Sequence, residues 1–298
     1  MTEANLSLKG RLLRGLVRLL GALPLAVSRL LGACVGRLNY VFNTRLAQTT
    51  RLNITRCFPA LNKAQSERLI KQSMIETGRV GLEIPLVWQK PRAWREERIL
   101  RVKNRELLDQ QLSTDSGLIL LVPHLGNWEL FSLYISRITQ MTTLYQPPKE
   151  AAMESLVRDA REREGATLVP TSNKGVMALF KALKAGGTTM ILPDQVPAPE
   201  AGEFAPFFGV PALTMTLANR LIERTGSRVL MAYAVRVRGG FEVVFEAPDE
   251  DIYSDDLQVS LRAMNRGVEK CVSAYPSQYQ WEYKRFRKQP EGLPKFYG

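Results

Sequence analysis

The chain of 298 residues holds a single histidine, so imidazole chemistry in this protein must use His124. Glu129 follows it by five positions. A carboxylate at this spacing can accept the Nδ1–H of the ring, which fixes the tautomer, leaves Nε2 as a base and favours the imidazolium. We therefore predict a His124–Glu129 dyad that deprotonates a hydroxyl or amine directed at an acyl donor. On spacing alone, the alternative is a structural histidine satisfied by a nearby glutamate.

The elements around His124 predict where it lies. Residues 118–123 form an apolar run typical of a buried strand, and Gly126 and Asn127 supply a turn and an N-cap for a helix over residues 126–137. His124 is thereby placed at the carboxyl end of a strand. In open α/β sheets, ligands bind at this edge.

Further along the chain, short apolar runs alternate with amphipathic stretches, which is typical of an α/β fold. Strands are predicted at 142–145, 166–170 and 188–193, and helices at 45–58, 64–80, 150–164, 174–185, 213–225 and 255–274. Residues 229–238 and 241–248 predict a hairpin around Gly239 and Gly240. We expect a mixed, mostly parallel sheet flanked by helices and closed by this antiparallel edge, with residues 194–212 as a loop and residues 41–298 as one domain.

The N-terminal segment is basic and apolar. The net charge is +12, and residues 1–66 carry ten Lys and Arg against Glu3 alone. Within residues 1–40, the longest uncharged run is Leu19–Ser28, far short of the roughly 20 apolar residues that a spanning helix needs. At helical spacing, several arginines share one arc and leave a leucine-rich remainder: Arg11, Arg14, Arg18 and Arg29. We predict that residues 1–40 anchor the protein to a membrane, lying on anionic lipid or entering it steeply. The alternative is a core helix with its arginines in water.

Other function classes lose their sequence support. The three cysteines, Cys34, Cys57 and Cys271, form no C-x-x-C pair, and with one histidine they suggest neither a disulfide framework nor a metal site. The G-x-S-x-G, Walker A and G-x-G-x-x-G motifs are missing from the sequence. We expect no metal and no cofactor.

Several sequence blocks carry a specific resemblance. The stretch His124-Leu-Gly-Asn-Trp-Glu129 is similar to the H-x4-D/E motif of glycerolipid-type acyltransferases and, as written, resembles the lipid A late acyltransferases. Further blocks agree with that family in order: 51–59, 183–195, 204–209, 214–216 and 280–287. The resemblance implies a glycerolipid-acyltransferase-like fold and an enzyme on the cytoplasmic face of the inner membrane, held peripherally or by a single N-terminal anchor. It also implies an acyl-carrier-protein thioester as donor and a membrane glycolipid, a lipid A precursor, as acceptor.

Substrate binding is predicted for residues around this motif and in the later blocks. Arginines before Gly165 can bind an acceptor phosphate or stabilise an oxyanion; the resemblance favours Arg163 over Arg161. Asp194 ends a strand on the same edge as His124 and is predicted to orient that arginine or a sugar hydroxyl. The remaining predicted binding residues are Gln195, Asn127, Phe208 and Thr214.

Two alternatives stay open. The same chemistry can act on another lipid, such as a lysophospholipid, an ornithine lipid or a glycerol phosphate. A non-catalytic basic protein of membrane surfaces or nucleic acid is the rival from another class. Residues 281–288 interleave aromatic and basic side chains, and together with the N-terminal segment they predict a membrane interface rather than nucleic-acid binding.

Overall fold

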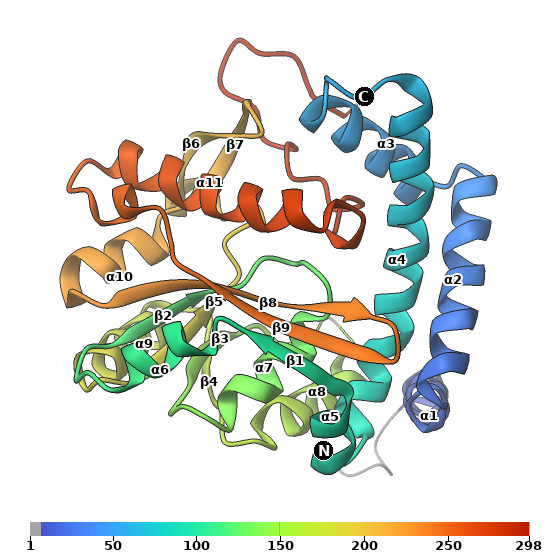
Figure 1. The fold of residues 1–298 in the computed structure, drawn as a ribbon, viewed down its shortest axis with the longest axis horizontal. Helices are drawn as coiled ribbons and strands as arrows, with labels where there is room; N and C mark the ends of the chain where they lie inside the picture. Colours follow the sequence, from blue (N-terminus) through green and yellow to red (C-terminus); the bar gives the residue numbers. More distant parts are fainter. Residues whose placement is uncertain (1–6, 149, 298) are drawn as a thin grey trace.

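A five-stranded sheet forms the centre of the computed structural model, which describes residues 7–148 and 150–297 (Figure 1). The strand order is β1–β9–β8–β2–β5. β2 runs parallel to β5 and β8, β9 runs antiparallel to β8, and β1 runs parallel to β9. These strands are β1 (Ile99–Lys103), β2 (Leu118–Leu121), β5 (Thr188–Ile191), β8 (Arg228–Val237) and β9 (Gly240–Glu246). The predicted mixed, mostly parallel sheet is confirmed.

Two small sheets accompany the central one. The first pairs β3 (Thr142–Tyr145) with β4 (Thr167–Pro170) in parallel and adjoins β5 through a bridge between Met141 and Thr188. The second is an antiparallel hairpin of β6 (Gly202–Phe207) and β7 (Val210–Met215).

Helices cover both faces of the central sheet (Figure 1). They are α1 (Leu8–Ala22), α2 (Leu25–Val41), α3 (Arg45–Cys57), α4 (Lys63–Gln89), α5 (Arg92–Arg98), α6 (Arg105–Leu112), α7 (Trp128–Ser136), α8 (Ala151–Glu162), α9 (Asn173–Lys184), α10 (Leu217–Thr225) and α11 (Leu257–Ala274). Short 3-10 turns lie at Pro199–Ala201, Glu250–Tyr253 and Pro276–Gln278.

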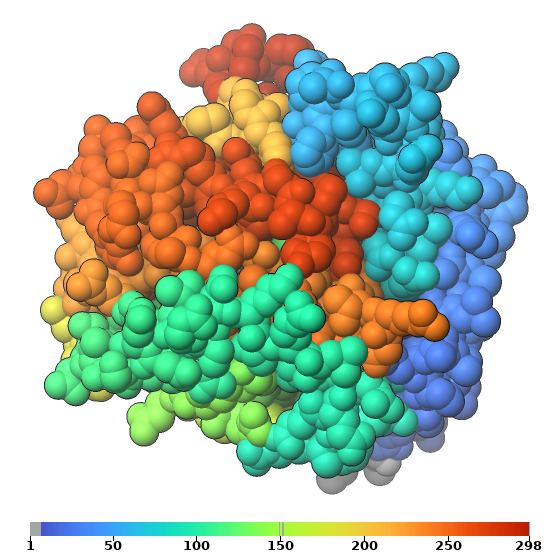
Figure 2. All heavy atoms as spheres, in the orientation of Figure 1, coloured from blue at the N-terminus to red at the C-terminus, as the bar shows by residue number. Residues whose placement is uncertain are grey.

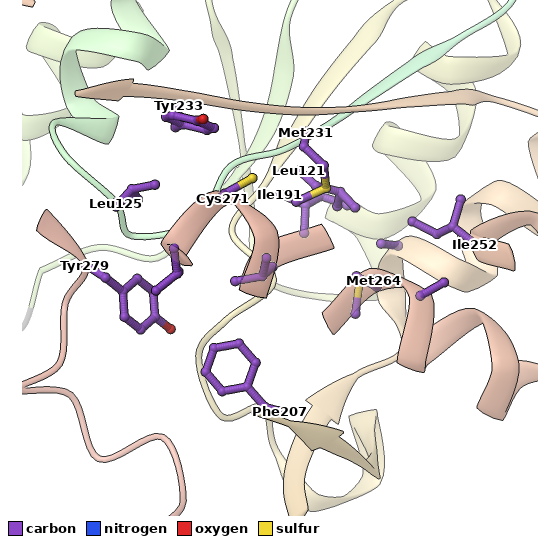
Figure 3. Close-up of a cluster of buried hydrophobic side chains, with 14 of the residues drawn as sticks. Leu121, Leu125, Ile191, Phe207, Met231, Tyr233, Ile252, Met264, Cys271 and Tyr279 are labelled. Carbon is purple, nitrogen blue, oxygen red and sulfur yellow. The ribbon is translucent and has the colours of Figure 1, made fainter. Parts of the chain in front are cut away.

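Alternation along the strands divides the core into two layers. Because successive strand residues point to opposite faces, Ile119 and Leu121 pack with α9, α10 and α11, whereas Leu118 and Leu120 pack with α4, α6 and α7. The first layer contains Phe207, Met264 and other side chains drawn in Figure 3. Both faces of β2 are therefore buried, which explains its continuous apolar sequence.

The helix α4 links the N-terminal helices to the rest of the molecule. It begins at a capping box in which Asn62 and Gln65 each bind the other's backbone N–H. The helices α2 and α4 cross closely, because a Cβ atom on Gly36 would lie 2.1 Å from the Met74 carbonyl oxygen. Only glycine permits this approach.

The outer surface of α1 is apolar. Four leucines at helical spacing are 51–67% exposed: Leu8, Leu12, Leu16 and Leu19. The N-terminal segment is not one continuous helix, because Leu23 and Pro24 separate α1 from α2. Arg29 of α2 turns inward to Glu83, at 2.6 Å. The exposed leucines and the inward Arg29 differ from the core-helix alternative, whereas the exposed Arg11 and Arg18 agree with it. Within the described ranges, no helix combines the length and the apolarity needed to cross a membrane.

Two expectations about the sheet were wrong. The β8–β9 hairpin is not an edge of the sheet, because β1 pairs with β9; β1 went unpredicted because charged residues interrupt its five positions. Residues 194–212 are not only a loop, since they hold β6 and the start of β7, and α10 begins at Leu217 rather than at residue 213. Pro206 and Pro211, directly paired across this hairpin, hide its strand pattern.

Candidate active site

His124 and Asp194 are brought together by the register of two parallel strands. Leu121 at the end of β2 lies opposite Ile191 at the end of β5, and Val122 continues the ladder by donating to the Ile191 carbonyl at 2.9 Å. Each strand is followed at the third position by one of the two residues. His124 and Asp194 consequently meet at the carboxyl edge of the sheet.

Asp194 holds His124 by two hydrogen bonds. Its Oδ2 accepts the backbone N–H of His124 at 2.8 Å, and its Oδ1 lies 2.8 Å from the imidazole Nδ1. Burial alone would raise the pKa of Asp194, but the charge of His124 and these hydrogen bonds hold it below its usual value. A carboxylate accepts, so Nδ1 carries a proton, and in the neutral imidazole Nε2 therefore has the lone pair. The side chain of His124 is 12% exposed and that of Asp194 only 2%.

The Nε2 atom of His124 faces a row of amides. The side-chain nitrogen of Gln195 lies 3.1 Å from it and 3.4 Å from the side-chain oxygen of Gln280. The ring of Trp128 meets the imidazole edge-on, with centroids 4.9 Å apart. With Nδ1 bound to Asp194, Nε2 is the ring nitrogen that faces the Gln195 amide.

Glu129 is buried and holds Arg161. Both carboxylate oxygens of Glu129 accept from Arg161, and Oε2 also accepts from the Trp88 indole N–H at 3.0 Å. Burial alone would raise the pKa of Glu129, but Arg161 and Trp88, with a smaller contribution from the charge of His124, lower it. The Arg161 side chain is 30% exposed, and its Nε and one terminal nitrogen are used by Glu129. Among residues 7–148 and 150–297, none accepts a hydrogen bond from its second terminal nitrogen, Nη1.

The predicted partner of the imidazole was therefore wrong. Asp194, not Glu129, receives Nδ1–H, because strand register aligns His124 with Asp194, whereas Glu129 projects from the first turn of α7 toward Trp88 of α4 and Arg161 of α8. Glu129 still acts on His124 electrostatically.

The loop after His124 is rigidly held. Asn127 caps α7, as predicted, by accepting from the Leu130 N–H, and its amide donates to Glu83 at 3.3 Å. Gly126 has φ +66°, and a Cβ there would lie 2.0 Å from the Ala234 carbonyl oxygen. Its own carbonyl accepts from Arg236 at 3.0 Å. Asn127 is fully buried, so its contacts are those of a positioning residue.

The other predicted binding residues lie elsewhere. Arg163 is exposed and donates to the Trp88 carbonyl at 2.7 Å, so Arg161 rather than Arg163 joins Glu129. Thr214 is fully buried, and its hydroxyl accepts from Arg285 at 2.9 Å. Phe208 packs its ring against Phe58, with centroids 5.0 Å apart.

The C-terminal segment contributes to the site and the core rather than to an interface. Trp281 and Phe286 are 2% and 0% exposed and Arg285 is 3% exposed, which contradicts the prediction that residues 281–288 form a membrane-interface anchor. Sequence reasoning also missed Gln280 and Trp88. Gln280 begins the block 280–287 that carries the resemblance, and it lies directly before residues 281–288, whose alternation of aromatic and basic residues predicts a membrane interface.

Comparison with known proteins identifies the family that this chain resembles. A model of the bacterial lipid A biosynthesis acyltransferases matches residues 11–288. A lipid A biosynthesis lauroyltransferase of Escherichia coli K12 is 25% identical over 289 residues, covering 95% of this chain and 92% of the relative. A palmitoleoyltransferase of lipid A biosynthesis from the same organism is 26% identical over 281 residues, covering 92% and 90%. A lipid A myristoyltransferase, again from Escherichia coli K12, is 23% identical over 267 residues, covering 84% and 79%.

Proposed function

The chain belongs to the bacterial lipid A biosynthesis acyltransferase family, and from this membership we propose that it moves a fatty acyl chain from an acyl-carrier-protein thioester to a hydroxyl of a lipid A precursor, with His124 as the base. It is an acyltransferase, as its relatives are named. The observation that carries the mechanism is the hydrogen bond between Asp194 and His124 Nδ1, because it holds the proton of the neutral imidazole on Nδ1 and leaves Nε2 to act as the base.

The reaction needs one proton to move twice. His124 Nε2 takes the proton of the acceptor hydroxyl as its oxygen attacks the thioester carbonyl carbon, and a tetrahedral oxyanion forms. The C–S bond then breaks, the carbonyl re-forms, and the imidazolium returns the proton to the leaving thiolate. Asp194 stabilises the imidazolium between these steps. The Gln195 amide, now 3.1 Å from Nε2, occupies the place that the acceptor hydroxyl takes when it binds.

Arg161 is the candidate for stabilising the oxyanion. Glu129 fixes the guanidinium of Arg161 through two hydrogen bonds, and the Tyr145 ring centroid lies 5.8 Å from the guanidinium carbon. Because Arg161 is already held in place, its side chain needs little reorganisation when the oxyanion forms. Glu129 thus acts as a positioning residue for Arg161.

The substrates fit the charge and surface of the protein. Acyl carrier proteins are acidic, and the chain carries a net charge of +12, which favours their encounter. The exposed leucines of α1 offer an apolar face to a bilayer, while the exposed Arg11 and Arg18 can meet anionic headgroups. We place the enzyme peripherally on the cytoplasmic face of the inner membrane.

Lipid analysis tests the function. Cells with the gene deleted are complemented with the wild-type chain or with His124→Ala, and their lipids are compared by mass spectrometry. Lipid A that lacks one secondary acyl chain in the deletion and the His124→Ala strains, but not in the wild-type strain, supports the proposal. A change confined to phospholipids or aminolipids would indicate another acceptor, and no change at all would favour a non-catalytic protein.

A further inference from the structure

A cleft of about 640 Å³ lies between the start of α2, the side of α4 and the tip of the β8–β9 hairpin. Figure 2 shows the tip of this hairpin, in orange, between α4 and α2 on one side and the segment from α5 to β1 on the other. None of the residues assigned to the active site lines it. Its walls carry five arginines and one carboxylate: Arg29, Arg79, Arg98, Arg236, Arg238 and Glu76.

Two of these arginines are already neutralised. Arg29 binds Glu83 at 2.6 Å and donates to the carbonyls of Val237 and Gly240 in the hairpin. Arg236 is 4% exposed and binds Glu76 at 2.8 Å and Glu83 at 3.3 Å. They build the floor of the cleft, and two carboxylates balance their two charges.

The other three arginines carry an uncompensated charge. Arg79 shares Glu76 with Arg236, and its buried Nε has no hydrogen-bond partner. Arg98 stacks on Trp94, 5.8 Å from the ring centroid, which leaves the edge of its guanidinium open. Across residues 7–148 and 150–297, no carboxylate forms an ion pair with Arg98 or Arg238. Five arginines against two carboxylates leave the cleft with a charge of about +3.

The surroundings of the cleft point to a lipid. Pro24, Leu25 and Ala26 line it at the junction of α1 and α2, and the next residue, Val27, is 40% exposed. Leu30, one helical turn further along α2, is 65% exposed, so α2 presents apolar side chains to solvent next to the cleft. A molecule that presents an anion to the arginines at this place has an apolar surface beside it.

We propose that this cleft binds a phosphate group carried by a lipid. Arginine forks match phosphate oxygens in paired hydrogen bonds. The unpaired Arg98 and Arg238, together with Arg79, which shares Glu76 with Arg236, suit a doubly charged monoester better than a single carboxylate. The volume admits a sugar phosphate or a headgroup. The same ligand chemistry has two sources here, the phosphate of the glycolipid acceptor and the headgroup of a bulk anionic phospholipid.

The cleft is connected to the catalytic loop. Arg236 donates to the Gly126 carbonyl at 3.0 Å, and Gln278, which also lines the cleft, accepts from the Gly126 N–H through its carbonyl at 3.0 Å. A phosphate in the cleft is therefore separated from the residue two positions after His124 by one layer of side chains. The site is placed to orient a lipid relative to His124.

The variants leave the carboxylate network intact. Arg98→Gln/Arg238→Gln removes the two arginines that have no ion pair, and the matched control, Arg220→Gln/Arg262→Gln, removes the same charge from exposed positions on α10 and α11. Circular dichroism and melting temperature establish that each variant folds. Co-sedimentation with vesicles of phosphatidylcholine alone, or with phosphatidic acid added, measures binding without turnover and so does not depend on the proposed function.

A second arm rests on the proposed function and measures KM for a lipid A precursor before and after phosphatase treatment. A loss of about tenfold or more in binding to phosphatidic acid vesicles by the cleft variant, with KM unchanged, assigns the site to bulk lipid. A comparable rise in KM for the untreated acceptor, absent for the treated one, assigns it to the acceptor. Equal behaviour of the cleft variant and its control in both arms overturns the proposal. A change limited to kcat/KM for the protein-bound donor also overturns it and assigns the cleft to the carrier protein.

Discussion

Replacing Asp194 by asparagine tests the assignment of the catalytic base most directly. The wild-type carboxylate accepts two hydrogen bonds at 2.8 Å, one from the backbone N–H and one from Nδ1–H of His124. An amide of the same shape accepts at one position and donates at the other. If its oxygen takes the backbone N–H, its NH2 faces Nδ1 and forces the proton onto Nε2, which then cannot act as a base.

The other orientation is no better. If the amide oxygen accepts Nδ1–H, the NH2 opposes the buried backbone N–H of His124. An unsatisfied buried donor costs about 1–3 kcal/mol, and the lost charge-assisted hydrogen bond to the imidazolium costs about 1.5–3 kcal/mol more. At about 1.36 kcal/mol for each tenfold change in rate, kcat/KM is expected to fall by roughly 10² to 10⁴.

Nitrogen-15 NMR measures the cause separately from the rate. Because the chain holds one histidine, a sample with labelled histidine gives the signals of His124 alone. At alkaline pH the wild-type protein should show the Nδ1–H tautomer, and Asp194→Asn should shift the population toward Nε2–H. If Asp194 were only structural and did not set the tautomer of His124, the folded Asp194→Asn variant would show no such shift.

The control is Asp115→Asn, which changes an exposed carboxylate that precedes β2, at the opposite end of this strand from His124, and should leave both the rate and the tautomer unaltered. Glu129→Gln should lower the rate but keep the Nδ1–H tautomer, because Glu129 does not bind that nitrogen. Near wild-type turnover by Asp194→Asn, or an unchanged tautomer beside a large loss of rate, would refute the reasoning.

Four further outcomes are expected. His124→Ala should lose about 10² to 10⁴ in rate at an unchanged melting temperature, and retained turnover would exclude it as the base. Substituting Leu12, Leu16 and Leu19 by Gln should weaken vesicle binding by about 10²-fold or more, since each leucine removes about 1 kcal/mol or more of apolar transfer; substituting the exposed Leu112, Met177 and Leu293 should not. Raising salt from about 0.05 to 0.3 M should lower kcat/KM for the carrier-protein donor more than for acyl-CoA, and equal dependence would remove the carrier protein. Burial raises the pKa of Glu282 in the folded protein above its pKa in the unfolded chain. The protonated side chain therefore stabilises the fold below the unfolded-state pKa, and this contribution is lost as the pH rises through the folded-state pKa. Relative to the wild type, Glu282→Gln should raise Tm progressively above about pH 4.5, and a gain in Tm that is independent of pH would contradict this.

Much of the fold followed from local patterns. Both faces of β2 are covered, so its run of apolar residues was recognisable, and Asn62 and Asn127 cap their helices with their own side chains. Such capping hydrogen bonds join residues only three positions apart, so the sequence around each cap is enough to predict them. The strand β1 depends instead on β9, which is distant in the chain, and the charged residues of β1 give no strand signal. The β6–β7 hairpin is local, but its two paired prolines remove the strand signal.

The choice between Arg161 and Arg163 shows why the residues of the site are harder to predict from sequence than the secondary structure. Two positions apart on a helix, the side chains point about 200° apart, so only one can face Glu129. Which one does so depends on how α8 is rotated against α7 and α4, and no short-range pattern states that rotation. The structure places Arg161 on Glu129 and leaves Arg163 on the surface.

To predict the pairing of His124 with Asp194, one must know that β2 and β5 are neighbours in the sheet, which no local sequence pattern shows. Once Leu121 is known to lie opposite Ile191, the two segments Val122-Pro123-His124 and Leu192-Pro193-Asp194 run in parallel and their third residues must meet. Glu129 was the nearer carboxylate in sequence and therefore the apparent partner. It is instead used to hold Arg161, so the site divides its two carboxylates between the proposed base and the proposed oxyanion donor. Hydrogen bonds from His124 to Asp194 and from Arg161 to Glu129 offset the cost of burying these carboxylates.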